Sequence, residues 1–190
     1  GRAGGSEELG GMRGVKHYMQ RSAIQGSPDM LTAVTSTWIN GAAELKAPAH
    51  PFTRDFDKLQ IGETIHTAGR EVSLKDIEHF ADFTGDRFYA HMDAEAAKAN
   101  PFFSDRVAHG YLLLSFAAGL FVEPNPGPVL ANTGLNNLSF QKPVLVGDRI
   151  AVQLTVKRKT RRTAEYGEVR WYVVLRNQDL DKAAEYELLT

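Results

Sequence analysis

Cysteine is absent from this chain of 190 residues, which excludes disulfides, thiolate zinc sites and any cysteine nucleophile. An excess of charge is also lacking, because 22 basic and 23 acidic side chains leave a net charge of -1. That balance argues against a nucleic-acid partner. The longest apolar run, residues 111–122, is too short to span a bilayer, and no secretory leader is visible. We therefore expect a cytoplasmic globular protein with no membrane partner.

Glycine is concentrated at the start, where it fills six of the first fourteen positions. The Gly-Lys-Ser/Thr of a phosphate-binding loop does not follow, so no nucleotide site is predicted there. Residues 1–47 have no periodic apolar run long enough for a core, and residues 47–51, Ala-Pro-Ala-His-Pro, are typical of a linker. We expect a tail plus linker over 1–47, which packs poorly on the rest, and one domain over 48–190.

Helix signals open the domain. Ser73 and Asp76 have the spacing of a capping box, and Gly85 stands where that helix should end. Asp93 is expected to begin a second, short helix. Residues 107–121 are apolar on nearly all sides, which predicts a buried helix.

The last third of the chain has the two-residue period of half-buried antiparallel strands. One buried helix followed by such strands favours an α+β fold, with an antiparallel sheet wrapped around the central helix. The alternating apolar positions are Ile150, Val152, Leu154 and Val156 in one strand, and Val169, Trp171, Val173 and Leu175 in the next.

Asp86 and His91 lie five residues apart in an irregular stretch, and Gly110 lies near the start of the buried helix. A carboxylate and an imidazole that share one water can act as a general acid–base pair. The N–H of Gly110, at a helix N-terminus, can donate to a developing oxyanion. Structural alternatives stay open: a turn Asp, a surface or core His, and a Gly needed for close packing.

Several separated landmarks together resemble one family. They are Gly85-Asp86, His91-x-Asp93, Val107-Ala108-His109-Gly110-Tyr111-Leu112, Leu138-Ser139-Phe140 and Pro143-Val144-x-x-Gly147-Asp148. In this order they resemble the MaoC-like, hydratase-2 branch of the hot-dog fold. The resemblance implies that residues 48–190 form a hydratase-type enzyme for acyl-CoA thioesters, with no cofactor beyond the coenzyme A of the substrate. It assigns Asp86 and His91 jointly as the acid–base pair. An open sheet edge further predicts a homodimer or larger homo-oligomer.

The first residues resemble a different family. Gly1-Arg2-Ala3-Gly4-Gly5-Ser6-Glu7-Glu8-Leu9-Gly10-Gly11, with His17-Tyr18-Met19-Gln20, is similar to the C-terminal end of an aldehyde dehydrogenase. A dehydrogenase tail joined to a MaoC-like domain resembles the bifunctional ring-opening proteins of bacterial phenylacetate degradation. That resemblance implies hydrolytic ring opening of an oxepin-CoA. Dehydrogenase activity is not expected in this chain, because the nucleophile of an aldehyde dehydrogenase is a cysteine and this chain contains none.

Departures from the hydratase-2 pattern bear on the substrate. Phe88 and Tyr89 stand where most members have Asn-Pro, and Ala118 stands where the helix often carries a serine. These changes favour a flat, less polar substrate over a straight-chain enoyl-CoA. Three alternatives remain: an (R)-specific hydratase of linear enoyl-CoA, a hot-dog acyl-CoA thioesterase, and a non-catalytic assembly module.

A basic run at an expected hairpin tip includes Lys157, Arg158 and Arg161. These cations suit the phosphates of coenzyme A, including coenzyme A bound to a neighbouring subunit. The alternative is a solvated turn. The six histidines are scattered without ligand spacing, so no metal site is predicted.

Overall fold

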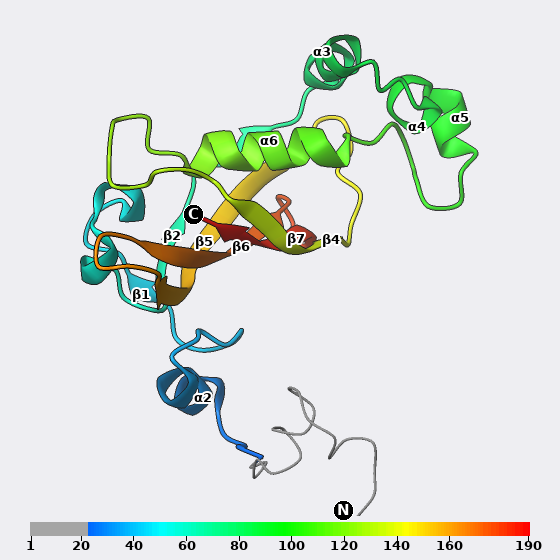
Figure 1. Cartoon of the computed structure of the whole chain (residues 1–190). Coiled ribbons are helices and arrows are strands. Elements are labelled where there is room, and N and C mark those ends of the chain that lie inside the picture. Colours follow the sequence, from blue (N-terminus) through cyan, green and yellow to red (C-terminus); the bar gives the residue numbers. More distant parts are fainter. Residues whose placement is uncertain (1–22) are drawn as a thin grey trace, which may run out of the picture.

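The computed structural model describes residues 23–190, and Figure 1 shows a sheet with helix α6 lying across one face. Among these residues, no helix combines the length and hydropathy that a bilayer crossing requires. The helices are α2 (Pro28–Thr35), α3 (Leu74–Thr84), α4 (Tyr89–Met92), α5 (Ala94–Lys98) and α6 (Gly110–Phe121), with 3-10 turns η2 (Pro51–Thr53) and η3 (Phe56–Lys58). The strands are β1 (Leu45–Lys46), β2 (Glu63–His66), β3 (Arg70–Glu71), β4 (Gly134–Phe140), β5 (Arg149–Arg161), β6 (Gly167–Arg176) and β7 (Lys182–Leu189).

The sheet runs in the order β1, β2, β5, β6, β7, β4, and β3 pairs with β5 at one side. All pairs are antiparallel except the short β1–β2 pair. The alternation predicted for the last third of the chain is confirmed. In β5, Val152 lies beside Leu175 and Leu154 beside Val173, and all four side chains are buried. The buried face of the β5–β6 hairpin therefore forms one side of the core.

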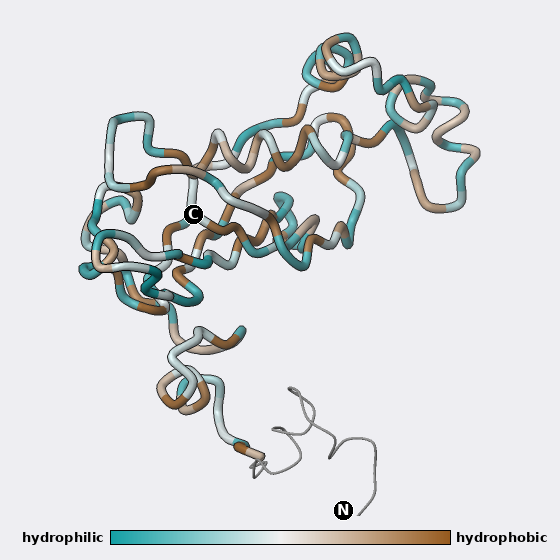
Figure 2. Tube along the Cα trace, in the orientation of Figure 1, coloured by the Kyte–Doolittle hydropathy of each residue, from teal (hydrophilic) through white to brown (hydrophobic). Residues whose placement is uncertain are grey.

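Helix α6 covers this face of the sheet, and Figure 2 shows hydrophobic residues along the helix and in the strands beneath the helix. This is the predicted α+β arrangement of a sheet around a central helix. Two details differ from prediction: α6 begins at Gly110 rather than at residue 107, and only its sheet side is buried. Leu112, Leu113, Ala117 and Phe121 enter the core, whereas Tyr111, Ser115 and Gly119 are exposed.

Helices α3, α4 and α5 form an arm beyond one end of α6 (Figure 1). The predicted capping box is confirmed: Ser73 Oγ accepts from Asp76 N at 3.2 Å, and an Asp76 oxygen accepts from Ser73 N at 2.9 Å. Gly85 ends α3 with φ at +80°, a conformation that side-chain-bearing residues rarely adopt. The turn at Gly85 sends the chain back toward α6.

The segment before the domain packs on the outer face of the sheet. Trp38 is buried, and its ring centroid lies 5.5 Å from that of Tyr172 on β6. The main-chain N–H of Trp38 donates to the Lys157 carbonyl at 2.7 Å, and β1 continues the sheet beside β2. The expectation that residues 1–47 pack poorly is therefore wrong for residues 36–46. A single Trp that packs on two strands produces no periodic pattern, so this packing could not be predicted from the sequence. Residues 1–22 lie outside the described residues.

Candidate active site

Three side chains from three segments meet where the arm joins the N-terminal end of α6. Asp86 follows α3, His91 lies in α4, and His109 directly precedes α6. One oxygen or nitrogen atom from each side chain lies within 4.8 Å of the corresponding atoms of the other two. Asp86 is exposed, His91 half-buried and His109 fully buried. The predicted pair, Asp86 and His91, is therefore brought together in the fold rather than left in separate turns.

The His91 ring is held by one hydrogen bond. Its Nδ1 lies 2.7 Å from the Val107 carbonyl oxygen, an atom that only accepts, so Nδ1 carries the proton. The lone pair of neutral His91 then sits on Nε2, where it can accept a proton from water. Burial lowers the pKa of His91 below its ordinary value, and the adjacent His109 acts in the same direction. The Val107 bond and the Asp86 charge oppose this shift. A neutral base is thereby favoured near neutral pH.

The Asp86 carboxylate is placed mainly by its main chain. Its Oδ1 accepts a long hydrogen bond from Phe88 N at 3.4 Å, which is an Asx-turn contact. Its main-chain carbonyl accepts from His109 Nε2 at 2.9 Å. The turn role considered as an alternative is thus real, and it coexists with a carboxylate that faces His91. Exposure keeps the carboxylate open to water and substrate.

Gly110 is the first residue of α6, and in the described chain its N–H has no acceptor. The first full helical bond in this turn runs from Leu113 N to the His109 carbonyl at 3.1 Å. A Cβ at Gly110 would lie only 2.6 Å from Cζ of Phe140, on β4. Both readings of Gly110 are therefore supported: close packing against an aromatic ring, and a free donor at a helix N-terminus.

The sequence pointed to His109 only as a structural neighbour of Gly110. In the fold it stacks on His91, with ring centroids 3.8 Å apart and planes at 29°. One nitrogen of each ring already bonds to a main-chain carbonyl, His91 Nδ1 to that of Val107 and His109 Nε2 to that of Asp86, which leaves one nitrogen in each ring for another partner. No ligand-like spacing in the sequence signals this stacking, because it depends on how the arm folds back.

The predicted coenzyme A contacts lie at the other end of α6. Lys157 Nζ is 2.7 Å from Glu187 Oε1, and Arg161 pairs with Asp57, so only Arg158 is an exposed cation with no ion pair to the described residues. Within one chain these residues do not reach Asp86 and His91. Of the three, Arg161 lines a cavity of about 650 Å³ under the loop that follows α6. Its walls include Leu130, Trp171, Tyr166, Arg54, Arg161 and Arg162.

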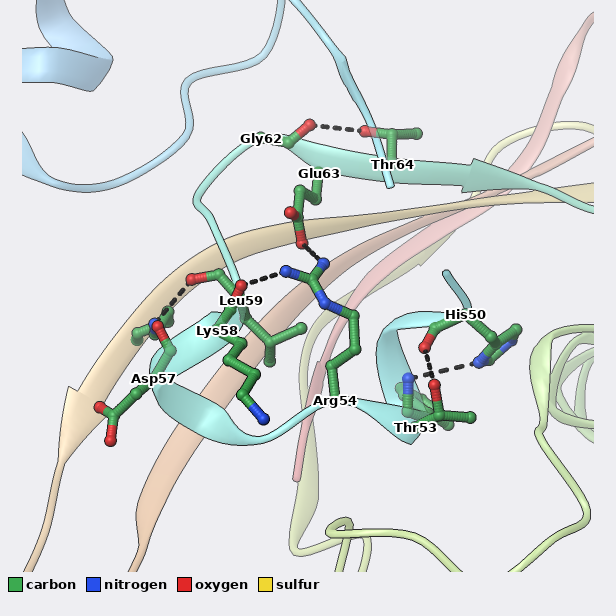
Figure 3. Close-up of polar contacts among 11 residues, drawn as sticks. His50, Thr53, Arg54, Asp57, Lys58, Leu59, Gly62, Glu63 and Thr64 are labelled. Carbon is green, nitrogen blue, oxygen red and sulfur yellow. Dashed lines mark hydrogen bonds and ion pairs between the residues drawn. The ribbon is translucent and has the colours of Figure 1, made fainter. Parts of the chain in front are cut away.

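The wall of this cavity contains a buried ion pair (Figure 3). Arg54 Nη1 lies 2.5 Å from Glu63 Oε2, and the same guanidinium donates to the Lys58 carbonyl. Glu63 is only 2% exposed, so its charge depends on this partner. The Arg54 guanidinium is consequently engaged in contacts within the fold, and we do not expect it to bind a ligand.

The chain is similar in sequence to two curated proteins. The chain is 50% identical over 175 residues to Protein MaoC of Klebsiella aerogenes, covering 90% of this chain and 52% of that protein. It is 36% identical over 104 residues to a 3-hydroxybutyryl-CoA dehydratase of Methylorubrum extorquens, covering 53% of this chain and 62% of that protein. The chain thus spans between half and two thirds of the length of these two relatives.

Solved structures agree in fold. A monoamine oxidase regulatory protein from Archaeoglobus fulgidus matches with a TM-score of 0.65 and 33% identity, over 70% of this chain and 92% of that one. The R-hydratase PhaJ1 from Pseudomonas aeruginosa matches with a TM-score of 0.59 and 28% identity, over 70% and 82%. These likenesses confirm the predicted hot-dog fold. The family model for the MaoC like domain matches residues 57–177, a span that holds Asp86, His91 and Gly110, and the chain therefore belongs to the MaoC-like dehydratase family.

Proposed function

We propose that this domain adds water to the conjugated double bond of an unsaturated acyl-CoA. The observation that carries the proposal is the Asp86–His91 pair facing the free N-terminus of α6. His91 offers an unprotonated Nε2, Asp86 offers an exposed carboxylate, and Gly110 offers a free N–H. General acid–base help of this kind contributes roughly two to four powers of ten to the rate.

The proposed step consumes one water and needs no redox partner or further cofactor. The water oxygen bonds to the β-carbon, one water proton passes to the Asp86–His91 pair, and a proton from the pair reaches the α-carbon. Negative charge develops on the thioester oxygen as the nucleophile attacks. The Gly110 N–H, with the positive end of the α6 dipole, stabilises that charge in the transition state.

We propose an oxepin-CoA as the preferred substrate. If water adds to the ring carbon that bears the ring oxygen, the adduct is a hemiacetal. Its C–O bond then breaks, the ring oxygen takes a proton, and an aldehyde forms while the thioester stays intact. Flat apolar surfaces beside the pair support this choice. The Phe88 ring is partly exposed and lies 4.5 Å from that of Tyr89 and 6.0 Å from that of His91.

A homo-oligomer is part of the proposal, because β4 lies at the sheet edge with β7 as its only neighbour among the described strands. Its side chains are largely exposed, including Leu135 and Leu138. Antiparallel pairing of β4 with a second copy would cover this edge. Sedimentation velocity tests this, and a fully active monomer would contradict it.

The context of the domain is also a proposal. We infer that residues 1–47 comprise the C-terminal tail of an upstream aldehyde dehydrogenase domain and a linker, and that the protein acts in the cytoplasm in phenylacetate catabolism. The partial coverage of the longer MaoC relative supports a larger parent protein. Under this proposal, the aldehyde made here is the substrate of the missing dehydrogenase.

Product analysis tests the reaction. The chain is incubated with an oxepin-CoA, a linear enoyl-CoA and a saturated acyl-CoA, and products are identified by mass spectrometry with a thiol assay for free coenzyme A. We expect a gain of one water on the oxepin-CoA, faster than on the linear substrate, with no free thiol. Faster turnover of the linear substrate would assign a simple hydratase, release of thiol a thioesterase, and no reaction an assembly module.

A further inference from the structure

His109 is the one fully buried titratable group at the site that the proposed reaction does not use. Its side chain touches both members of the pair. Nε2 lies 2.9 Å from the main-chain oxygen of Asp86, and the ring stacks on His91 at 3.8 Å between centroids. We propose that His109 is a positioning residue, whose Nε2–H fixes the main chain of Asp86 while its ring fixes the plane of His91.

The hydrogen bonds show which ring nitrogen carries the proton in each of the two histidines. A carbonyl oxygen only accepts, so His109 must carry its proton on Nε2, whereas His91 carries its proton on Nδ1 toward Val107. Opposite tautomers are thus set by two main-chain carbonyls. The consequence is that His91 keeps an unprotonated Nε2 at the site, with the ring of His109 stacked against it.

His109 is costly as a space-filling residue. It is 1% exposed, and among the described residues nothing bonds to its Nδ1. A buried nitrogen without a partner destabilises a fold, and a phenylalanine would fill the same space without one. Phe80 packs on the same imidazole, with ring centroids 5.0 Å apart, so the surroundings are suited to an aromatic ring. What the imidazole adds is the Nε2–H donor toward Asp86.

Asp86 needs such a tether. Its side chain is exposed and keeps only the long Asx contact with Phe88. The position of the carboxylate therefore depends on the position of the Asp86 main chain. The turn after Gly85 would otherwise be anchored only by α3. A hydrogen bond to the carbonyl of Asp86 itself restrains the residue directly, which matters because displacements near 1 Å at a reacting centre cost about a hundredfold in rate.

Two variants separate the parts of this role. His109→Phe keeps a buried ring for stacking but removes the donor, and His109→Gln replaces the ring with an amide whose Nε2 can still donate. Both are first checked for an unchanged circular dichroism spectrum and melting temperature. We expect His109→Phe to lower kcat about tenfold or more with little change in KM. We expect His109→Gln to recover several-fold of that loss.

A readout without substrate completes the test, since the kinetic arm rests on the proposed hydratase function. Long-range proton–nitrogen NMR of the full chain should show His109 with its proton on Nε2 and His91 with its proton on Nδ1. In His109→Phe, the acidic limb of kcat/KM should move to higher pH, because His109 lowers the pKa of His91 and is absent from the variant. A folded His109→Phe with wild-type kcat and pH profile, or a wild-type His109 protonated on Nδ1, would overturn the proposal. Absence of hydratase activity in the wild type would instead overturn the proposed function, and leave the tautomer result to decide whether His109 holds Asp86.

Discussion

The two ends of α6 use charge in opposite ways. At the N-terminal end, Asp86 and His91 lie close together in partial exposure, with free lone pairs and few partners. At the C-terminal end, Arg54 and Arg161 are each bound to a carboxylate around a cavity. Groups that must change their protonation or bind a ligand are left underpartnered, whereas groups that hold the fold are neutralised. The comparison predicts that changes at the first end affect turnover and changes at the second end affect stability.

The largest expected effect is on stability at the cavity end. Arg54→Ala leaves Glu63 buried without its guanidinium, which should lower the free energy of unfolding by about 3–5 kcal/mol. Urea unfolding followed by tryptophan fluorescence measures this. Arg161→Ala is the matched control, since its pair with Asp57 is solvent-exposed and should contribute about 0–1 kcal/mol. Equal losses in the two variants would remove the distinction between buried and surface pairs.

The next effect is on turnover at the other end. Asp86→Asn keeps the shape but removes the charge, and His91→Ala removes the imidazole. Each should lower kcat by about two or more powers of ten, with the double variant little worse than either, because both act on one water. Steady-state kinetics measures this. Asp82→Asn, an exposed carboxylate on α3, is the control that should leave kcat unchanged. Multiplicative losses in the double variant would mean that the two residues act independently.

A smaller effect is expected at Gly110. The Cβ of Gly110→Ala would meet Phe140 at 2.6 Å and displace either the ring or the helix start. Because the N–H survives but is shifted, kcat should fall roughly tenfold, less than for complete loss of an oxyanion donor. Gly119→Ala on the exposed side of α6 has open space, so it should keep full activity and be slightly more stable. If Gly110→Ala lowers only the melting temperature, the glycine serves packing alone.

The pH dependence gives the finest distinction. Burial lowers the pKa of His91, so the neutral, active form persists below the ordinary value of 6.5. The acidic limb of kcat/KM should therefore have its midpoint below pH 6.5, with activity rising as pH rises through it. The unfolded chain binds this proton more readily, so the contribution of His91 to stability also falls as pH drops below 6.5. A midpoint above 6.5 that vanishes in Asp86→Asn would show that the Asp86 charge outweighs burial.

The sequence predicted what local pattern controls. Asp86 and His91 lie in one short stretch after a glycine with φ at +80°, and the apolar residues at alternate positions of β5 and β6 enter the core as predicted. It did not predict contacts made through main-chain atoms or distant aromatic rings. The bond from His109 to the carbonyl of Asp86 has no side-chain signature, because any residue has that carbonyl. Phe140 covers Gly110 from a strand that follows α6 in the chain, which only the fold can bring about.

The packing of Trp38 on Tyr172 decides where this domain should be cut from its neighbours. A truncation at the Ala47–Pro48 junction would discard β1 and uncover Tyr172 and Val174, leaving an apolar, aggregation-prone stripe on β6. A start point ahead of Pro28 keeps that stripe covered. Poor expression of a shorter version would then report a misplaced boundary, not an unstable fold.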